Sequence, residues 1–150
     1  MKVLLQRVSR ASVTVDGDVV GKIGAGLLLF VGFGQGDTEA QLQPIVDKIL
    51  KLRIFPDLND CQNGRMNSSV LDHELEVLAV SQFTLYADCK KGNRPSFNQS
   101  LEPKEASRLY DTFCELLELA NPGKVARGIF AADMKVELVN DGPVTIILRS

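Results

Sequence analysis

Short runs of apolar residues at the start of the chain predict a β-meander. Residues 3–8, 11–15 and 19–23 are each typical of a strand. The last two runs flank Asp16-Gly17-Asp18, and an Asp-Gly step between alternating apolar residues predicts a hairpin because its turn needs positive φ.

Two later runs, 26–33 and 76–88, are apolar at consecutive positions. Such a run is typical of a strand covered on both faces, so 76–88 is predicted to be a central strand. Within the 76–88 run, the apolar residues are followed by small polar residues, with no Gly or Pro between them. Alternation at period 2 would place Ser81 and Phe83 on one face and Gln82 and Thr84 on the other. These polar groups either find backbone partners or serve a ligand.

Helical spacing appears in two segments. Thr38 and Gln41 form a possible capping box before an apolar periodicity over 42–52, and Pro44 implies either a kink or a later start. Glu102-Pro103 opens the second helix, and Asn121-Pro122-Gly123 ends it. The second helix has one apolar stripe, which predicts a core face: Ala106, Leu109, Tyr110, Phe113, Leu116, Leu117 and Ala120.

The last part of the chain predicts two more strands. Residues 130–134 lead into a strand over 135–139, and 144–148 form the last strand, with a hairpin around 140–143. Residues 56–69 predict a loop. Strands dominate and two helices cover them, so we expect one α/β domain over 1–150, with a strongly curved pair of sheets and helices on one side.

Composition excludes several classes of protein. No apolar run approaches the roughly 20 residues that cross a bilayer, and the arginines near the N-terminus argue against a signal peptide, so we expect a cytoplasmic protein. A net charge of -2 counts against binding along a nucleic-acid backbone. Cys61, Cys89 and Cys114 have no metal or disulfide spacing and are expected to be free thiols.

The polar residues offer little conventional catalytic machinery. Ser81 or Thr84 as a nucleophile would need a neighbouring base, and no triad is visible. His73, the only histidine, falls in a predicted loop and is expected to be structural or solvent-exposed. No His, Cys, Asp and Glu cluster has ligand spacing, so a metal is not expected. We expect no cofactor.

A set of motifs in a fixed order resembles the D-aminoacyl-tRNA deacylases. The motifs are Gln6-Arg7-Val8, Ala11-Ser12-Val13-Thr14-Val15, Ser81-Gln82-Phe83-Thr84, Asn93-Arg94-Pro95-Ser96-Phe97 and Asn140-Asp141-Gly142-Pro143-Val144-Thr145. No single one of these motifs is specific for the family, but the motifs in this order, in a chain of this length, are. The resemblance implies a three-layer sheet, sheet and helix fold, and a homodimer with active sites at the subunit interface.

The resemblance also implies a reaction. The enzyme would hydrolyse the ester of D-aminoacyl-tRNA, and glycyl-tRNA mischarged on tRNA-Ala would escape the chiral filter. The RNA 2′-hydroxyl would assist, while Ser81, Gln82, Phe83 and Thr84 form the pocket and the Phe83 N–H stabilises the oxyanion. Thr84 as a direct nucleophile is the disfavoured version. Three nearby cations, Lys90, Lys91 and Arg94, could hold the tRNA acceptor end, or they could be a solvated loop.

Chiral selection is implied at Gly142-Pro143. Base rates favour a trans bond before proline, whereas the resemblance implies a cis bond whose carbonyls enter the partner's pocket. Arg7 matches a position that steadies this segment, and its alternative is a cation on an edge strand. Phe130 and Met134 match the stretch that lines the adenosine end, or they are core residues.

Other functions stay open from the sequence. The chain could bind an acceptor stem without turnover, could be a small-molecule-binding or purely structural dimer, or could be a related deacylase for tRNA mischarged with a small L-amino acid.

Overall fold

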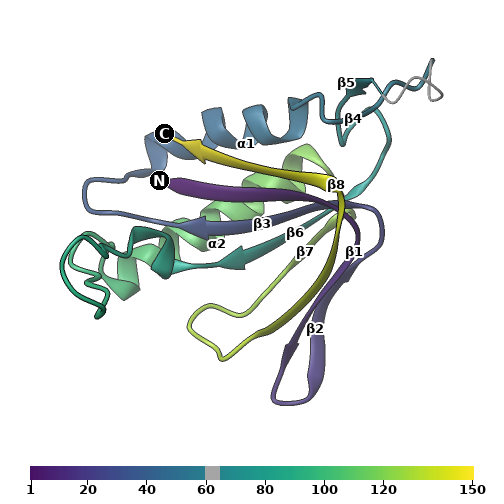
Figure 1. Cartoon of the computed structure of the whole chain (residues 1–150). Helices are drawn as coiled ribbons and strands as arrows, with labels where there is room; N and C mark the ends of the chain where they lie inside the picture. The colour runs from purple at the N-terminus through teal and green to yellow at the C-terminus, as the bar shows by residue number, and fades with distance from the viewer. Residues whose placement is uncertain (60–64) are drawn as a thin grey trace.

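The computed structural model describes residues 1–59 and 65–150, which form a curved sheet with two α-helices (Figure 1). In chain order the elements are β1 (Lys2–Val15), β2 (Asp18–Ile23), β3 (Gly26–Gly32), α1 (Leu42–Lys51), β4 (Phe55–Pro56), β5 (Met66–Ser68), β6 (Glu76–Ser81), α2 (Pro103–Ala120), β7 (Val125–Arg127) and β8 (Lys135–Arg149). Two 3-10 turns are η1 (Glu39–Gln41), before α1, and η3 (Phe83–Tyr86), after β6.

The sheet is built on β1, which pairs with three other strands. Its first half is antiparallel to β3, its second half is antiparallel to β2, and β8 runs antiparallel to nearly all of it. The two strands predicted over 3–8 and 11–15 are therefore one strand. The hairpin between β1 and β2 is confirmed, with positive φ at Asp16 and Gly17. β6 and β7 extend the sheet from β3 in parallel.

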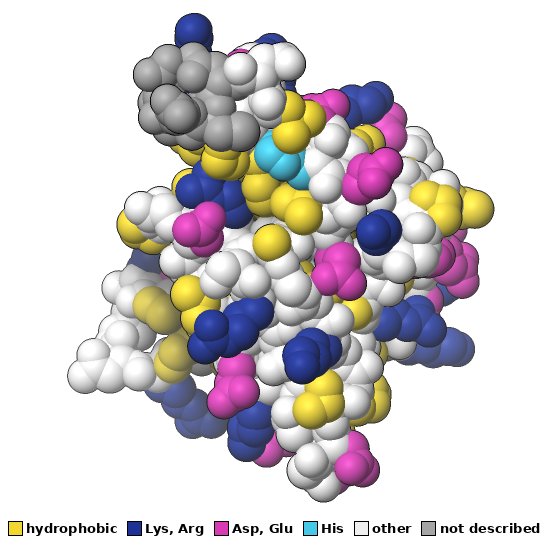
Figure 2. Space-filling model, turned by 90° about the vertical axis from the view of Figure 1, so that its right-hand side faces the viewer, with side chains coloured by type: hydrophobic (Ala, Val, Ile, Leu, Met, Phe, Trp, Pro, Cys, Tyr) yellow, Lys and Arg dark blue, Asp and Glu magenta, His cyan; other side chains and the backbone are white. Residues whose placement is uncertain are grey.

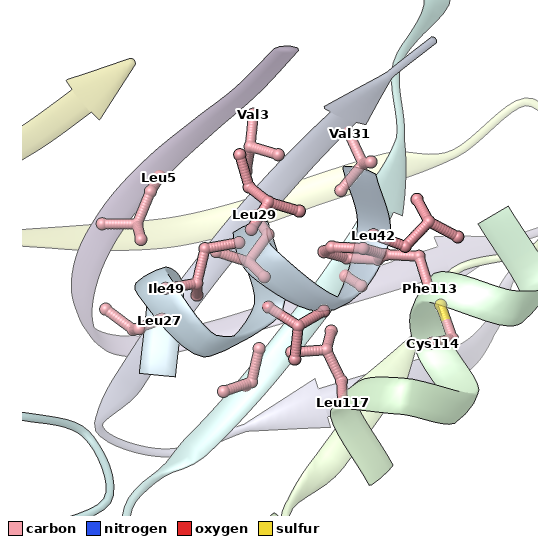
Figure 3. Packing of buried hydrophobic residues seen from close by; sticks show 14 of the residues in the cluster. Val3, Leu5, Leu27, Leu29, Val31, Leu42, Ile49, Phe113, Cys114 and Leu117 are labelled. Carbon is pink, nitrogen blue, oxygen red and sulfur yellow. The ribbon is translucent and has the colours of Figure 1, made fainter. Parts of the chain in front are cut away.

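The sheet curls, so that β3 and β6 are covered on both faces, as predicted. In Figure 1, β2 and the adjoining half of β1 bend away from β3 and β6. Alternate residues pack with the helices: Leu27, Leu29 and Val31 of β3 (Figure 3), and Val77 and Ala79 of β6 belong to the same cluster. The residues between them enter a second cluster inside the curl: Leu28, Leu78 and Val80. The expected pair of sheets is thus two halves of one continuous sheet, and the layered α/β class is confirmed.

Both helices pack on the same face of the sheet, because their apolar residues share the first cluster. Pro44 is the third residue of α1, where the first turn tolerates a residue without an N–H, so the helix needs no kink. The second helix begins and ends as predicted, with the Glu102 side chain accepting a hydrogen bond from the Glu105 amide at 2.7 Å. Tyr110 lies in the core and donates to the Ala79 carbonyl at 2.9 Å.

The predicted C-terminal hairpin is wrong. β8 is a single strand of 15 residues that passes through 140–143 without reversing. The pairing goes from Val8↔Asn140 to Gln6↔Thr145, so two steps on β1 correspond to five on β8. The turn-forming residues therefore produce a bulge within a strand. We call residues 140–144 the β8 bulge.

The central strand is shorter than predicted. β6 ends at Ser81, and η3 follows it, so the predicted alternation of Ser81 and Phe83 against Gln82 and Thr84 is wrong. A helical turn does not keep the period of a strand. The predicted loop over 56–69 is paired at its ends through β4 and β5. Cys61 lies outside the described residues, while Cys89 and Cys114 are free thiols.

None of the helices in the described ranges is long and apolar enough to cross a membrane.

Candidate active site

A pocket of about 640 Å³ opens at the carboxyl ends of β3 and β6. Its walls come from these strand ends, from the start of α2 and from the segment between β7 and β8. Among the predicted site residues it is lined by Ser81, Gln82, Phe83, Phe130 and Met134. Carboxyl ends of parallel strands are a usual place for a ligand, because strand and loop groups converge there.

Thr84 is not a wall of this pocket. Its side chain is exposed, and its hydroxyl accepts a hydrogen bond from the Gln82 amide, a group that cannot act as a base. Phe83 is the first residue of η3, and a helical turn does not use its own first N–H groups. The Phe83 amide is therefore available at the pocket edge.

Several contacts fix η3 against the rest of the molecule. The Ser100 hydroxyl donates to the Phe83 carbonyl at 3.3 Å, and the Lys2 ammonium donates to the Leu85 carbonyl at 3.0 Å. Close backbone packing adds to this, because a Cβ at Gly32 would lie 2.7 Å from the Gln82 carbonyl oxygen. The pocket wall is thus held in place by its neighbours.

The side chain of Tyr86, the last residue of η3, makes both a hydrogen bond and a cation–π contact. Its hydroxyl donates to Asp37 Oδ2 at 3.2 Å, and Lys2 Nζ lies 4.2 Å from its ring centroid. Asp37 also accepts from the Met1 ammonium at 2.5 Å and from the Gly34 amide at 2.7 Å. Burial, and then the Asp37 carboxylate, raise the pKa of Tyr86 to about 12.

Sequence pattern offered little reason to select Tyr86 and Asp37 as site residues. The one available signal was the pair of glycines Gly32 and Gly34, because another backbone segment or an aromatic ring can pack closely against a strand where a residue has no side chain. A Cβ at Gly34 would lie 2.2 Å from Tyr86 Cε1, so the ring occupies the space of the missing side chain.

The other predicted site residues form the β8 bulge and its anchor. Arg7 Nε donates to the Asp141 carbonyl at 3.1 Å and lies 3.3 Å from Asp141 Oδ2, while Nη1 donates to the Ile54 carbonyl at 2.6 Å. Asn140 accepts from the Val144 amide at 3.1 Å. The Arg7 side chain is only 12% exposed and β1 is paired on both sides, so the edge-strand alternative is wrong.

Gly142 and Pro143 are exposed, and the bond between them is cis, which is the geometry that the resemblance implies. Gly142 has φ of 123°, and a Cβ there would lie 2.8 Å from Arg7 Nη2. Both the backbone conformation and the packing therefore require glycine.

The bulge and the pocket of one chain are separate. Arg7 pairs with Leu27 on β3, whereas the pocket begins at Val31, four residues on, or about 13 Å along the strand. In Figure 1, β8 bends sharply at the end of the sheet opposite to the 3-10 turn and loop that follow β6. Neither Arg7 nor Gly142-Pro143 lines the pocket.

His73 is also remote from the pocket, because it precedes β6 while Thr84 follows it. Its Nε2 lies 2.9 Å from the Pro56 carbonyl, and its ring centroid lies 5.7 Å from that of Phe55. Figure 2 shows the histidine beside hydrophobic side chains. These contacts agree with a structural role. No group of three His, Cys, Asp or Glu residues that could hold a metal occurs within 1–59 and 65–150.

Comparisons with known proteins agree over nearly the whole chain. A family model described as D-Tyr-tRNA(Tyr) deacylase matches residues 4–149. A D-aminoacyl-tRNA deacylase of Halothermothrix orenii is 54% identical over 151 residues, which cover 100% of this chain and 97% of the relative. One of Magnetococcus marinus is 53% identical over 148 residues, which cover 99% and 95%.

Two solved structures have the same fold. One, described as c-Myc DNA Unwinding Element Binding Protein, has a TM-score of 0.92 and 42% identity, and the match covers 100% of this chain and 99% of that one. The other, described as a probable eukaryotic D-amino acid tRNA deacylase, has a TM-score of 0.84 and 20% identity over 98% and 97% of the two chains. With the full-length match to the family model and to relatives above 50% identity, these findings show that the chain belongs to the D-Tyr-tRNA(Tyr) deacylase family, a family of hydrolases.

Proposed function

We propose that this protein hydrolyses the ester bond of D-aminoacyl-tRNA and releases the D-amino acid and free tRNA. The observation that carries the proposal is the position of the Ser81–Phe83 segment, which lines a pocket large enough for an aminoacyl-adenosine end. Membership of a deacylase family over residues 4–149 supports the same reaction. The proposal includes a cytoplasmic location, because translation uses aminoacyl-tRNA there.

Catalysis in this proposal depends on positioning. The ester is already activated, and the neighbouring RNA 2′-hydroxyl orients or activates the attacking water. The Phe83 amide donates to the carbonyl oxygen as negative charge develops on it. Ser81 and Gln82 form the pocket wall beside it, and Thr84 holds the Gln82 side chain from behind by accepting its amide hydrogen bond. His73 takes no part, because it lies beyond the opposite end of β6.

The chiral filter is assigned to the β8 bulge of a second copy of the chain. Within one chain the bulge does not reach the pocket, yet Gly142 and Pro143 are exposed. Arg7 holds the segment by two contacts to Asp141, and its bond to the Ile54 carbonyl fixes the Arg7 side chain itself. In a homodimer, the carbonyls of this segment would face the α-ammonium of the amino acid in the partner's pocket. An L side chain would collide with main-chain atoms there.

The adenosine end of the substrate is assigned to the side of the pocket made by Phe130 and Met134. Both residues line it, and the Phe130 ring packs 6.0 Å from that of Tyr110 in the core. A filter that acts on the side chain cannot reject glycine, so glycyl-tRNA mischarged on tRNA-Ala is a second substrate of this proposal.

The deciding experiment is a single-turnover assay at saturating protein with matched D- and L-aminoacyl-tRNA. Release of the D-amino acid with the L-ester largely intact is expected. Equal rates on both esters, or no release from either, would refute the proposal. Sedimentation of the same preparation measures the dimer, and a monomer that retained full selectivity would refute the assignment of the filter to a second copy.

A second candidate is a nucleic-acid-binding protein without turnover. The solved structure with 42% identity is of a protein described as binding a DNA unwinding element, and the described residues include no acid–base pair or metal site at the pocket. This candidate predicts binding of the acceptor end with no release of amino acid in the same assay. Preferential release from a small L-aminoacyl-tRNA would instead indicate the related deacylase with altered chirality.

A further inference from the structure

The loop between η3 and α2, residues 88–100, lies beside the pocket and carries a local excess of positive charge. The cations are Lys90, Lys91 and Arg94, and the only acidic residue in the segment is Asp88. All three cations are exposed, and none takes part in a salt bridge within the described parts of the chain. This contrasts with the net charge of -2 of the whole chain.

Backbone hydrogen bonds close this loop and attach its C-terminal end to neighbouring segments. Asp88 and Ser96 exchange two backbone hydrogen bonds of 2.8 and 2.9 Å. Near the other end, the Gln35 amide donates to the Gln99 carbonyl at 2.9 Å, and its side chain donates to the Asn98 carbonyl at 2.5 Å. The cations are therefore presented from a loop that is closed on itself, and that is bonded to the segment after β3 by Gln35 and to η3 by the Ser100 hydroxyl.

Two exposed aromatic rings line the pocket, and one of them, Phe97, belongs to this loop. Phe83 is 59% exposed and Phe97 is 37% exposed, although both are large apolar side chains. Their centroids are 5.0 Å apart in an edge-to-face arrangement, and both rings border the pocket. An exposed aromatic ring on a loop that also carries three cations without a salt bridge can meet the two needs of a single-stranded nucleic acid, which are base stacking and phosphate neutralisation.

We propose that Phe97, with Lys90, Lys91 and Arg94, forms a platform for the single-stranded RNA nucleotides that precede the terminal aminoacylated nucleotide. A base stacks on the exposed Phe97 ring, and the three cations contact the phosphates on either side. This inference rests on the proposed function for the position of the RNA end, which enters the pocket beside Phe83. It explains how a chain with net negative charge holds tRNA, because contact is restricted to one basic loop.

The test uses RNA that carries no amino acid, so that its outcome does not depend on catalysis. Two RNA hairpins with the same stem are compared by fluorescence anisotropy, one with a four-nucleotide 3′ overhang and one blunt. We expect the wild-type protein to bind the overhang hairpin at least tenfold more tightly. Phe97→Ala should lose about tenfold in affinity for the overhang hairpin, whereas Phe97→Tyr, which keeps a ring for stacking, should retain most of it.

The cations are tested by the salt dependence of binding. Replacing Lys90, Lys91 and Arg94 together by glutamine should reduce the slope of log K against log salt by about 2, since each phosphate contact with a single strand contributes about 0.7. The matched control replaces three exposed lysines elsewhere, Lys48, Lys51 and Lys124, by glutamine. It changes the net charge equally and should leave the slope close to that of the wild type.

Equal affinity for the two hairpins, or an unchanged slope in the loop variant, would overturn the proposal. So would a Phe97→Ala variant that binds RNA normally but loses self-association, because this face would then be covered by a second copy of the chain. The outcome is separable from that of the proposed function. If the wild-type protein binds the overhang but does not hydrolyse D-aminoacyl-tRNA, only the deacylase proposal is refuted. If it hydrolyses the ester but shows no overhang-dependent binding, only the platform proposal is refuted.

Discussion

The segment after β6 and the β8 bulge are both polar interruptions of strands, but different interactions hold them. The first follows a strand buried on both faces, and glycines without side-chain volume let its backbone and the Tyr86 ring pack closely. The second lies in an exposed strand, and its shape depends on hydrogen bonds from Arg7 and within Asn140–Val144. Packing therefore specifies the pocket, whereas a few directed polar contacts specify the bulge.

The largest expected effect follows from removing the anchor of the bulge. Arg7→Ala leaves the Asp141 and Ile54 carbonyls without their donor, and hydrogen bonds to charged groups contribute about 1.5 to 3 kcal/mol each. We expect a loss of about 3 kcal/mol in the free energy of unfolding, at the low end of the sum for two bonds, because the Asp141 carbonyl is exposed and water can replace its donor. We also expect about a hundredfold loss in single-turnover rate on the D-ester, because a displacement of about 1 Å can cost that much.

Arg10→Ala is the matched control, since Arg10 lies on the same strand but is exposed and makes no ion pair in the described part of the chain. It should change neither the urea midpoint nor the rate by more than a small factor. If Arg7→Ala were as active as Arg10→Ala, the shape of the bulge would not depend on the polar contacts of Arg7.

A smaller effect is expected from overfilling the packed half of the site. In Gly34→Ala the new methyl group would lie 2.2 Å from the Tyr86 ring, so the ring must move and η3 with it. Overpacking of this kind costs about 1 to 3 kcal/mol. We expect the rate on the D-ester to fall about tenfold while the ratio of D to L rates stays high, because the filter is on the other element.

Gly36→Ala separates displacement from general destabilisation. Gly36 has φ of 86° and no atom within 4 Å of an added Cβ, so alanine there is strained without touching Tyr86. It should lower stability by about 1 kcal/mol and leave the single-turnover rate unchanged. Equal rate losses in the two variants would mean that stability alone, and not the position of η3, determines activity.

The sequence predicted the packed half of the molecule better than the polar half. The consecutive apolar runs predicted β3 and β6 as strands covered on both faces, because a strand that is buried on both faces needs apolar residues at consecutive positions. The same residues that favour a hairpin turn, Asn140-Asp141-Gly142-Pro143, form a bulge, because long-range pairing with β1 overrides local turn preference. The separate strands predicted over 3–8 and 11–15 were joined for a similar reason.

Tyr86 and Asp37 show why part of the site could not be predicted. They are 49 residues apart, and only the folded chain brings the hydroxyl and the carboxylate together. Arg7 likewise reaches Ile54 and Asp141 across the sheet. The sequence pattern indicates which residues are buried and where local turns form, but it does not show which polar groups far apart in the sequence lie close together in the fold.

The smallest effect is expected from Tyr86→Phe, which keeps the ring in its place and removes only the hydroxyl bond to Asp37. One hydrogen bond of this kind contributes about 1 kcal/mol, so the variant should unfold at slightly lower urea concentration at pH 8 and keep most of its single-turnover rate. Tyr86→Leu, which also removes the ring beneath Lys2, should lose more of both.

The pH dependence of that difference tests the contact more sharply than its size. The pKa of Tyr86 is raised to about 12 from an unfolded value near 10, so the folded state holds this proton more tightly. Its contribution to stability is fully present below pH 10 and is lost as the pH rises toward 12. The wild type should therefore lose its advantage over Tyr86→Phe between these values in urea titrations. Tyr110, whose pKa is also raised by burial, titrates in both proteins and cancels in the comparison. A difference that stayed constant from pH 9 to pH 11.5 would show that the hydroxyl does not meet Asp37, and the packed half would then be held by apolar contacts alone.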